Sequence, residues 1–338
     1  MSLKLGITIP TYTWPDMDYR MAHTVVQDYA RRTEELGFES LTVWDHLTDA
    51  PGLYGGSWMD PLICLSAATA CTERIKLGTH ILVLPLRHPV LLAKEIATLD
   101  YISGGRFFFG VGPGWSKPEF DAMGIDLRER GRRTDEILDA CKRLLTEKHV
   151  SYKGEFFQFD DVTIDPMPPR YPEVWVAGGS RIPDELSPDK PYMVKTVMQR
   201  IARHADVFTC RASGKLEWVK RDVETVSEFL KSVGRDPATL GFAHVQAIYV
   251  VDTRDPEEAL RLQRPHIERM MGSNRSWDHL QECYMVGSVD QIVEKLKILE
   301  NAGMEHVTLQ PAGPDIEQVD LIAEKIAPHF AGMREGPG

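Results

Sequence analysis

Apolar and polar residues alternate along the chain at two different spacings. Short apolar runs recur from the first residues to the last, and longer stretches with the apolar spacing of an amphipathic helix separate them. This alternation predicts a parallel sheet wrapped by helices. Eight runs can be counted, so we predict an α/β fold, a (β/α)8 TIM barrel. The predicted strands cover residues 5–10, 39–46, 75–84, 107–112, 174–179, 205–210, 242–251 and 306–313.

Two segments are too long for a plain connection in such a barrel. Residues 152–169 lie beyond the fourth strand and its helix and resemble a small extended excursion, and residues 255–300 after the seventh strand exceed one barrel helix. We therefore predict insertions after strands four and seven, the second being a lid or an oligomer contact. Residues 1–330 are predicted to form a single domain and residues 331–338 a flexible tail.

Composition and charge restrict the class of partner. The chain has 338 residues, 43% of them hydrophobic, so it can bury a large core. A net charge of −11 makes nucleic acid and anionic membranes poor partners, which leaves a small-molecule substrate as the expectation. The start MSLKLGITIP lacks the features of a signal peptide, and no apolar run is long enough to span a membrane, so we expect a cytoplasmic protein.

Familiar catalytic motifs are absent from the sequence. It contains no nucleophile elbow, P-loop or HExxH helix, and its eleven histidines and five cysteines show no metal-ligand spacing. The first predicted strand is followed by TYTWP and not by the glycine-rich fingerprint of a doubly wound dinucleotide-binding fold. No metal is expected, and the chemistry must therefore come from a cofactor.

The ends of predicted strands one and two place aromatic and titratable residues at the mouth of the barrel. Tyr12 and Trp14 can wall a flat or apolar ligand there, or can simply pack on the scaffold. Because neighbouring strand residues point to opposite faces, either Asp45 or the pair Trp44 and His46 can reach a ligand. A histidine there can exchange a proton near neutral pH, so Asp45 and His46 are the catalytic candidates. The alternative is that both cap the following loop.

Glycines follow predicted strands four and five. Gly112 lets a planar ring approach the backbone closely, although a tight turn with Trp115 as a packing anchor is the alternative. Gly178, Gly179 and Ser180 offer backbone N–H groups and a hydroxyl, which suit a phosphate. A sharp turn that needs positive φ explains the same three residues.

Strand seven offers further polar groups. His244 and Gln246 share one face by alternation, so one of them can point inward. We name Gln246 as a substrate-pocket candidate beside Tyr12, Trp14 and Trp115. A hydrogen-bonded core residue is the alternative.

Ordered motifs over nearly the whole chain resemble the bacterial-luciferase-like flavin-dependent oxidoreductases. They include VWDH at 43–46, IKLGT and LPLRHPVLLAKEIATLDYISGGR within 75–106, FFFGVGPGW, ERGRRTDE, VWVAGGS and VGSVDQIVEKL. The resemblance implies a barrel, usually dimeric, that binds reduced FMN or a related deazaflavin at its mouth. By position, it places His46 and Thr79 near the ring, Gly112 where the ring approaches, and Gly178, Gly179 and Ser180 at the phosphate. It also implies a non-proline cis peptide bond within 79–82.

One departure from the family pattern bears on the reaction. Deazaflavin-dependent sugar-phosphate dehydrogenases similar to this family carry a glutamate directly after the strand-four glycines, where this chain has Pro113, Gly114 and Trp115. The absence of that acid counts against hydride transfer in their manner.

Three hypotheses follow from the resemblance. The first is a two-component monooxygenase, in which reduced FMN from a separate flavin reductase reacts with oxygen to oxidise a small organic substrate, with residues 52–58 and 255–282 as lids. The second is a deazaflavin-dependent dehydrogenase or reductase. The third is a non-catalytic flavin-binding protein. In each case we expect a homodimer.

Overall fold

The computed structural model describes residues 2–13, 19–181 and 192–330. Within these residues, eight parallel strands form a closed ring, because β7 pairs with β10 and β13 pairs with β1. The predicted (β/α)8 barrel is therefore confirmed. Around the ring the strands are β1 (Lys4–Thr8), β3 (Ser40–Val43), β5 (Lys76–Thr79), β7 (Phe107–Gly112), β10 (Glu173–Ala177), β11 (Val207–Thr209), β12 (Gly241–Ile248) and β13 (His306–Pro311).

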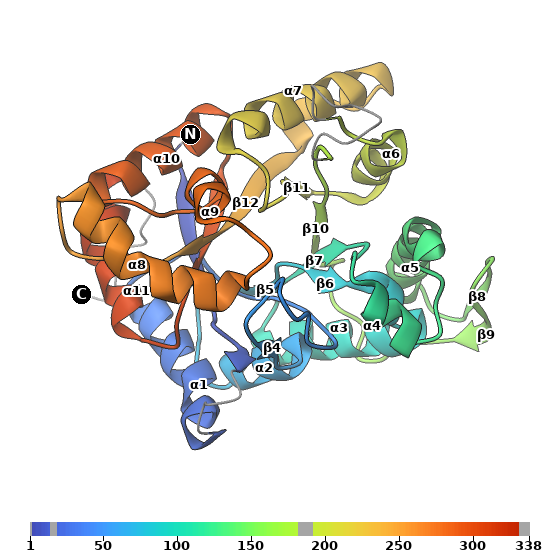
Figure 1. The fold of residues 1–338 in the computed structure, drawn as a ribbon. Coiled ribbons are helices and arrows are strands. Elements are labelled where there is room, and N and C mark those ends of the chain that lie inside the picture. The colour runs from blue at the N-terminus through green and yellow to red at the C-terminus, as the bar shows by residue number, and fades with distance from the viewer. Residues whose placement is uncertain (1, 14–18, 182–191, 331–338) are drawn as a thin grey trace.

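Helices surround the strands (Figure 1). Their starts follow local capping chemistry: Asp60 accepts the backbone N–H groups of Leu62 and Ile63, and Ser288 forms a capping box with Gln291. The α-helices are α1 (Tyr19–Glu35), α2 (Pro61–Thr69), α3 (Pro89–Ser103), α4 (Lys117–Ala122), α5 (Arg130–Leu144), α6 (Lys195–His204), α7 (Leu216–Ser232), α8 (Pro256–Met271), α9 (Trp277–Cys283), α10 (Val289–Asn301) and α11 (Glu317–Leu321). Single turns are η1 (Leu84–Leu86), η2 (Leu127–Glu129), η3 (Pro237–Thr239), η4 (Ile322–Ile326) and η5 (Ala327–His329).

The third predicted strand is divided in two. A cis peptide bond joins His80 and Ile81, inside the window that the family resemblance implies. After it, β6 (Leu82–Val83) pairs with β7 at Val111 and Gly112, further along than the pairing of β5 with β7. Residues 75–84 are thus two short strands and not one.

The two predicted insertions are present. A hairpin of β8 (Val150–Lys153) and β9 (Gln158–Val162) follows α5. It lies next to α5 and projects away from the barrel (Figure 1). After β12, the helices α8 and α9 precede the barrel helix α10. At the mouth, β2 (Tyr12–Thr13) pairs with β4 (Ser57–Trp58). The predicted tail 331–338 lies outside the described residues.

Alternation divides each strand between the helices and the barrel interior. On β13, Val307 and Leu309 join the large apolar cluster that packs strands against helices. His306, Thr308 and Gln310 occupy the opposite face. β12 follows the same rule: Phe242 and Ile248 belong to the large cluster, whereas alanines and Val245 between them join clusters of the interior and mouth.

Hydrogen bonds between side chains fill the centre of the barrel. Thr8 and Thr42 are joined at 2.7 Å, and Ser40 Oγ lies 2.8 Å from His306 Nε2. His80 spans the ring, because its Nε2 lies 2.6 Å from Thr209 Oγ1 and its Nδ1 lies 2.9 Å from Thr308 Oγ1. Burial lowers the pKa of His80 to about 3, so the imidazole is neutral at physiological pH.

We predict that buried neutral histidines make the fold sensitive to acid. Burial lowers the pKa of His244 to about 4, whereas the unfolded value is about 6.5. The unfolded chain therefore binds a proton that the folded chain excludes, and stability falls as pH drops below 6.5. Between about pH 7.5 and pH 5, His244 alone is expected to lower the free energy of unfolding by about 2 kcal/mol. Urea unfolding of wild type and His244→Gln at both pH values measures this difference.

When the pH is lowered, the free energy of unfolding of His244→Gln should fall by about 2 kcal/mol less than that of the wild type. His329→Gln, at an exposed position in η5, is the matched control and should keep the wild-type pH dependence. Equal pH dependence in His244→Gln and wild type would contradict the assignment.

Candidate active site

A buried carboxylate and a histidine meet at the barrel mouth. His46 follows β3, and Glu119 comes from α4, the first helix after β7. Glu119 Oε1 lies 3.0 Å from His46 Nδ1 and accepts the backbone N–H of Leu47 at 2.7 Å. The Glu119 side chain is 1% exposed, and among the described residues its Oε2 has no hydrogen-bond partner. This arrangement orients the imidazole and leaves one carboxylate oxygen available.

Glu119 was missed when strand ends alone were considered. It lies seven residues after Gly112, inside the helix that follows, whereas the expectation concerned an acid directly after the glycines. The acid directly after the glycines is absent from this chain, and a different glutamate, Glu119, contacts His46 in three dimensions. The available signal was an acid in the first turn of a helix that starts at a strand end of the barrel.

Three aromatic rings enclose His46. Ring centroids of Trp58, Tyr54 and Trp115 lie 4.8, 5.1 and 5.6 Å from the imidazole centroid. Trp58 and Tyr54 belong to the loop between β3 and α2, and Trp115 follows β7 with 47% of its surface exposed. These rings make the surroundings of the imidazole mostly apolar, with Trp115 on the open side.

Tyr12, on β2 after the first barrel strand, packs against the aromatic rings around His46. Its ring centroid is 6.5 Å from that of Trp58, and its buried hydroxyl donates to the carbonyl of Pro311. Burial raises the pKa of Tyr12 well above its ordinary value, so the hydroxyl stays protonated. The other predicted aromatic of this strand end, Trp14, lies outside the described residues.

The two predicted lids are joined to each other. The backbone N–H of Asn274, between α8 and α9, donates to the Gly52 carbonyl at 2.7 Å, and the Gly55 N–H donates to the Met270 carbonyl at 3.1 Å. Arg275 donates to the Leu53 carbonyl and lies over the Tyr54 ring at 5.2 Å. The loop 50–58 and the α8–α9 segment thus form one cover over the His46 side of the mouth.

Asp45 is held by protein groups on the strand-three side. Its Oδ2 accepts the backbone N–H of Val83 at 2.8 Å, and both of its oxygens lie 3.4 Å from Arg87 Nη2. Arg87 also reaches Asp60, the N-cap of α2, at 3.2 Å. Burial raises the pKa of Asp45, and the Arg87 charge opposes that shift. Asp45 therefore ties the end of β3 to β6, whereas His46 lies among the aromatic rings.

Thr79 and Gly112 make close contacts around the divided third strand. The Thr79 hydroxyl donates to the Gly110 carbonyl at 2.6 Å. A Cβ added at Gly112 would lie 2.8 Å from Ile81 Cδ1, so glycine here makes room for Ile81. The structure thus brings Gly112 and the cis-linked Ile81 together at the rim.

Ser180 does not present free donors. Its backbone N–H and its hydroxyl both donate to the carboxylate of Asp222 on α7. Gly178 packs against Val197, and Gly179, at φ +136°, lies against Arg211. A phosphate at Ser180 would have to take its hydrogen bonds from Asp222.

Gln246 and Gln310 lie on opposite sides of the barrel wall: Gln246 faces the helices, and Gln310 faces the interior. Gln246 Nε2 donates to His244 Nε2 at 2.8 Å, on the face of β12 whose apolar members pack against helices. Gln310 is fully buried on the inner face of β13, and neither of its amide atoms has a partner among the described residues. The sequence gives no signal for Gln310, because a single polar residue in a strand forms no pattern.

Other unpartnered polar atoms lie at the same end of the barrel. Within the described part of the chain, Thr11 Oγ1 after β1 and Trp44 Nε1 after β3 are buried without hydrogen bonds. Buried polar atoms are nearly always satisfied in folded proteins. A planar ring with donors and acceptors along its edge would satisfy these groups and both ends of the Gln310 amide. The residues present therefore fit a flavin-type ring at the mouth.

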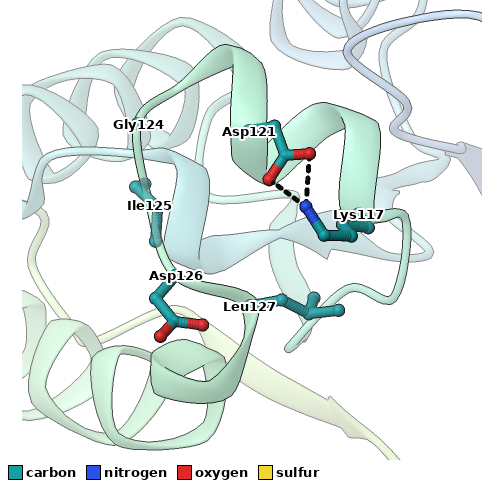
Figure 2. Close-up of a pocket in the computed structure, with 6 residues that line it drawn as sticks. All are labelled: Lys117, Asp121, Gly124, Ile125, Asp126 and Leu127. Atoms are coloured by element: carbon teal, nitrogen blue, oxygen red, sulfur yellow. Dashed lines mark hydrogen bonds and ion pairs between the residues drawn. The ribbon is translucent and has the colours of Figure 1, made fainter.

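A surface pocket lies on the other side of α4 from Glu119. Figure 2 shows Lys117 and Asp121 paired with each other along α4, with residues 124–127 completing the wall. Lys117 and Asp121 neutralise each other, Asp126 accepts the backbone N–H of Arg128, and none of the lining residues belongs to the His46 site. Across the residues that the structure covers, no three potential ligand side chains gather as a metal site, and no helix has the length and hydropathy to cross a membrane.

The barrel and the unpartnered polar groups at its mouth fit a planar coenzyme, and comparisons with known proteins give the class of protein. The family model described as luciferase-like monooxygenase matches residues 3–306. The F420-dependent glucose-6-phosphate dehydrogenase of Segniliparus rotundus is 25% identical, over 90% of this chain and 93% of its own. The FMNH(2)-dependent dimethylsulfone monooxygenase of Pseudomonas putida is 33% identical, over 51% of this chain and 46% of its own.

A solved structure shows the same architecture. Monooxygenase RslO1 from Streptomyces bottropensis superposes with a TM-score of 0.78 at 25% identity, covering 97% of this chain and 99% of that one. The chain belongs to the luciferase-like monooxygenase family, as the sequence motifs indicated, and is an oxidoreductase of that class.

We predict that Asp45 acts chiefly through structure. Asp45→Ala leaves the buried Val83 N–H and the Arg87 guanidinium without their acceptor, and the free energy of unfolding should fall by about 2–3 kcal/mol. Urea unfolding measures this change, with the exposed Asp49→Ala in the same loop as control. Unchanged stability together with lost activity would show instead that Asp45 contacts the ligand.

Proposed function

We propose that the protein is the oxygenase component of a two-component monooxygenase that oxidises a small organic substrate with reduced FMN and oxygen. The observation that carries this proposal is the enclosure of His46 by Tyr54, Trp58 and Trp115 beneath the joined cover. An apolar, covered site excludes water from a reactive centre. Reduced flavin, when bound, supplies the electrons that activate oxygen.

The chain's own residues would hold the coenzyme at the mouth. Gln310, Thr11 and Trp44 offer the unpartnered donors and acceptors for a ring edge, and Thr79 and Gly112 belong to the rim of strands three and four. Gly178 and Gly179 are half-exposed, and the Gly179 N–H would face a phosphate, whereas the Gly178 N–H donates to the Thr209 carbonyl at 3.0 Å and fixes the start of the turn. Ser180 would contribute through the Gly179–Ser180 turn that Asp222 fixes.

His46 is the proposed proton-exchanging group, and Glu119 is its positioning residue. Glu119 Oε1 fixes Nδ1 of the imidazole and also holds the loop through the Leu47 N–H, which leaves Nε2 for the substrate. Tyr12, Trp115 and the neighbouring rings would form the substrate wall. Asp45 would hold the strand ends beneath it.

One observation favours a second candidate, hydride transfer with a deazaflavin coenzyme. A dehydrogenase needs a base that accepts the proton of a substrate hydroxyl, and a histidine paired with a buried carboxylate meets that need. The relative from Segniliparus rotundus is F420-dependent by name. Oxygen takes no part in that reaction, so the two candidates are experimentally separable.

The comparison of coenzymes under air and under nitrogen tests the proposal. Anaerobic mixing with reduced FMN should change the coenzyme spectrum. With a flavin reductase, heavy-isotope oxygen and a panel of small organic compounds, label should enter a product. Anaerobic oxidation or reduction of substrate with the deazaflavin coenzyme would instead establish the second candidate. Tight binding of oxidised flavin without turnover would overturn both.

Glu119→Gln tests the proton relay in whichever reaction is found. The amide keeps an acceptor for the Leu47 N–H but removes the charge beside His46, so kcat should fall about a hundredfold. Coenzyme affinity should change less than about twofold. Asp121→Asn, on the exposed side of the same helix, is the control and should keep wild-type kcat. A rise in KM with kcat unchanged would contradict the assigned role.

We further propose a homodimer formed through α2 and α3. Ile63 on α2 is 73% exposed and Leu91 on α3 is 60% exposed, and these two helices pack side by side. Tyr101 and Ile102 add exposed apolar surface at the end of α3. Large apolar groups gathered on one face mark an interaction surface.

Light scattering after gel filtration should give the mass of two chains for the wild type. Ile63→Asp combined with Leu91→Asp should give the mass of one chain, because a buried unpaired charge opposes association. Ile298→Asp, at a similarly exposed apolar position on α10, should remain dimeric. A monomeric wild type would refute the proposal.

A further inference from the structure

A buried carboxylate contacts the turn that follows β10. The turn consists of Gly178, Gly179 and Ser180, and Asp222 reaches it from α7. The Ser180 N–H lies 3.2 Å from Asp222 Oδ1 and 3.0 Å from Oδ2, and the Ser180 hydroxyl donates to Oδ1. Ser180 is 6% exposed and Asp222 is 4% exposed, so these bonds are shielded from water. One carboxylate thus holds both donors of the serine.

The remaining backbone of the turn lies close to the same carboxylate. The Gly178 N–H donates to the Thr209 carbonyl at 3.0 Å, whereas the Gly179 N–H has no acceptor among the described residues. Gly179 has φ +136°, and a Cβ added there would lie 3.0 Å from Asp222 Oδ2 and 3.0 Å from Arg211 Cβ. Glycine therefore allows the Asp222 oxygen to approach the backbone closely.

Asp222 is surrounded by groups that favour its charged form. Burial raises the pKa of Asp222, and the two bonds from Ser180 and the charges of Arg221 and Arg211 oppose that rise. An ionised carboxylate only accepts hydrogen bonds, which agrees with the two donors that Ser180 directs at it. A negative charge of the protein therefore lies beside the turn.

A phosphate at this turn would gain few hydrogen bonds and would meet a like charge. The Gly179 N–H is the donor left for it, because Asp222 holds those of Ser180. Like charges repel strongly where water is excluded. Taking the Ser180 donors for the phosphate would leave a buried carboxylate without them, which is also unfavourable. A hydroxyl differs, because it can donate to the carboxylate.

We propose that Asp222 determines the selectivity of the site at the tail end of the coenzyme, so that reduced flavins with and without the terminal phosphate bind with similar affinity. The inference rests on the proposed function, because it concerns the coenzyme of that same site. The ring then supplies most of the affinity, through the unpartnered groups of Gln310, Thr11 and Trp44. Weak retention of the tail favours fast dissociation, which suits a coenzyme that a separate reductase delivers.

Calorimetric titration of the full-length protein with reduced FMN and with reduced riboflavin, both under nitrogen, tests the proposal without turnover. The two flavins differ by the phosphate, and the wild type should prefer FMN by less than about tenfold. Asp222→Asn keeps an acceptor for the Ser180 N–H but removes the charge, so it should raise the FMN preference about tenfold. Glu224→Gln, at an exposed position on α7 beside Lys220, is the matched control and should keep the wild-type preference.

A double substitution shows whether the released serine binds the phosphate. Ser180→Ala should lower the FMN preference in the Asp222→Asn background only. An FMN preference that is unchanged or lower in Asp222→Asn would overturn the proposal, because Asp222 would then support the phosphate or play no part in its binding. Riboflavin affinity within about twofold of the wild type shows that each variant is folded and keeps the ring site.

The wild-type titrations separate the two proposals and need no variant. A wild type that prefers FMN by more than about tenfold overturns the role of Asp222 alone, because the coenzyme still binds. A wild type that binds neither reduced flavin overturns the proposed function and this inference together.

Discussion

Closure of the sheet between β7 and β10 is the constraint on which the site depends. Parallel strands that form a ring must present all their carboxyl ends at one rim, whatever their distance along the chain. His46 after β3, Glu119 after β7, Arg211 after β11 and Gln310 in β13 become neighbours of one mouth for this reason. An open sheet would spread the same residues along an edge.

The interior of the ring contains several buried polar side chains, and this affects both stability and binding. Threonine hydroxyls and neutral imidazoles satisfy one another in the lower and middle parts, as in the bonds of His80 to Thr209 and Thr308. Toward the mouth this mutual satisfaction ends, and Gln310 and Trp44 remain without partners among the described residues. The fold thus leaves unpartnered polar groups at the mouth, and these suit the planar coenzyme proposed above.

Two separate segments form one cover over the aromatic side of the mouth. Tyr54 packs against His46, and the Arg275 guanidinium lies over the Tyr54 ring. Hydrogen bonds between residues 52–55 and 270–275 join the two segments. Displacement of the α8–α9 segment would therefore expose the aromatic rings around His46.

Local sequence patterns determined the architecture of this protein. Strand and helix periods, helix caps and the glycines at element ends are all properties of neighbouring residues. The eight strands, both insertions and the position of His46 at the end of strand two were readable in this way. Only the tertiary structure decided that His46 pairs with Glu119 and that Ser180 donates its hydrogen bonds to Asp222. It also decided which faces of their strands Gln246 and Gln310 occupy. Those contacts join residues far apart in sequence, and only the closed ring brings them within hydrogen-bond distance.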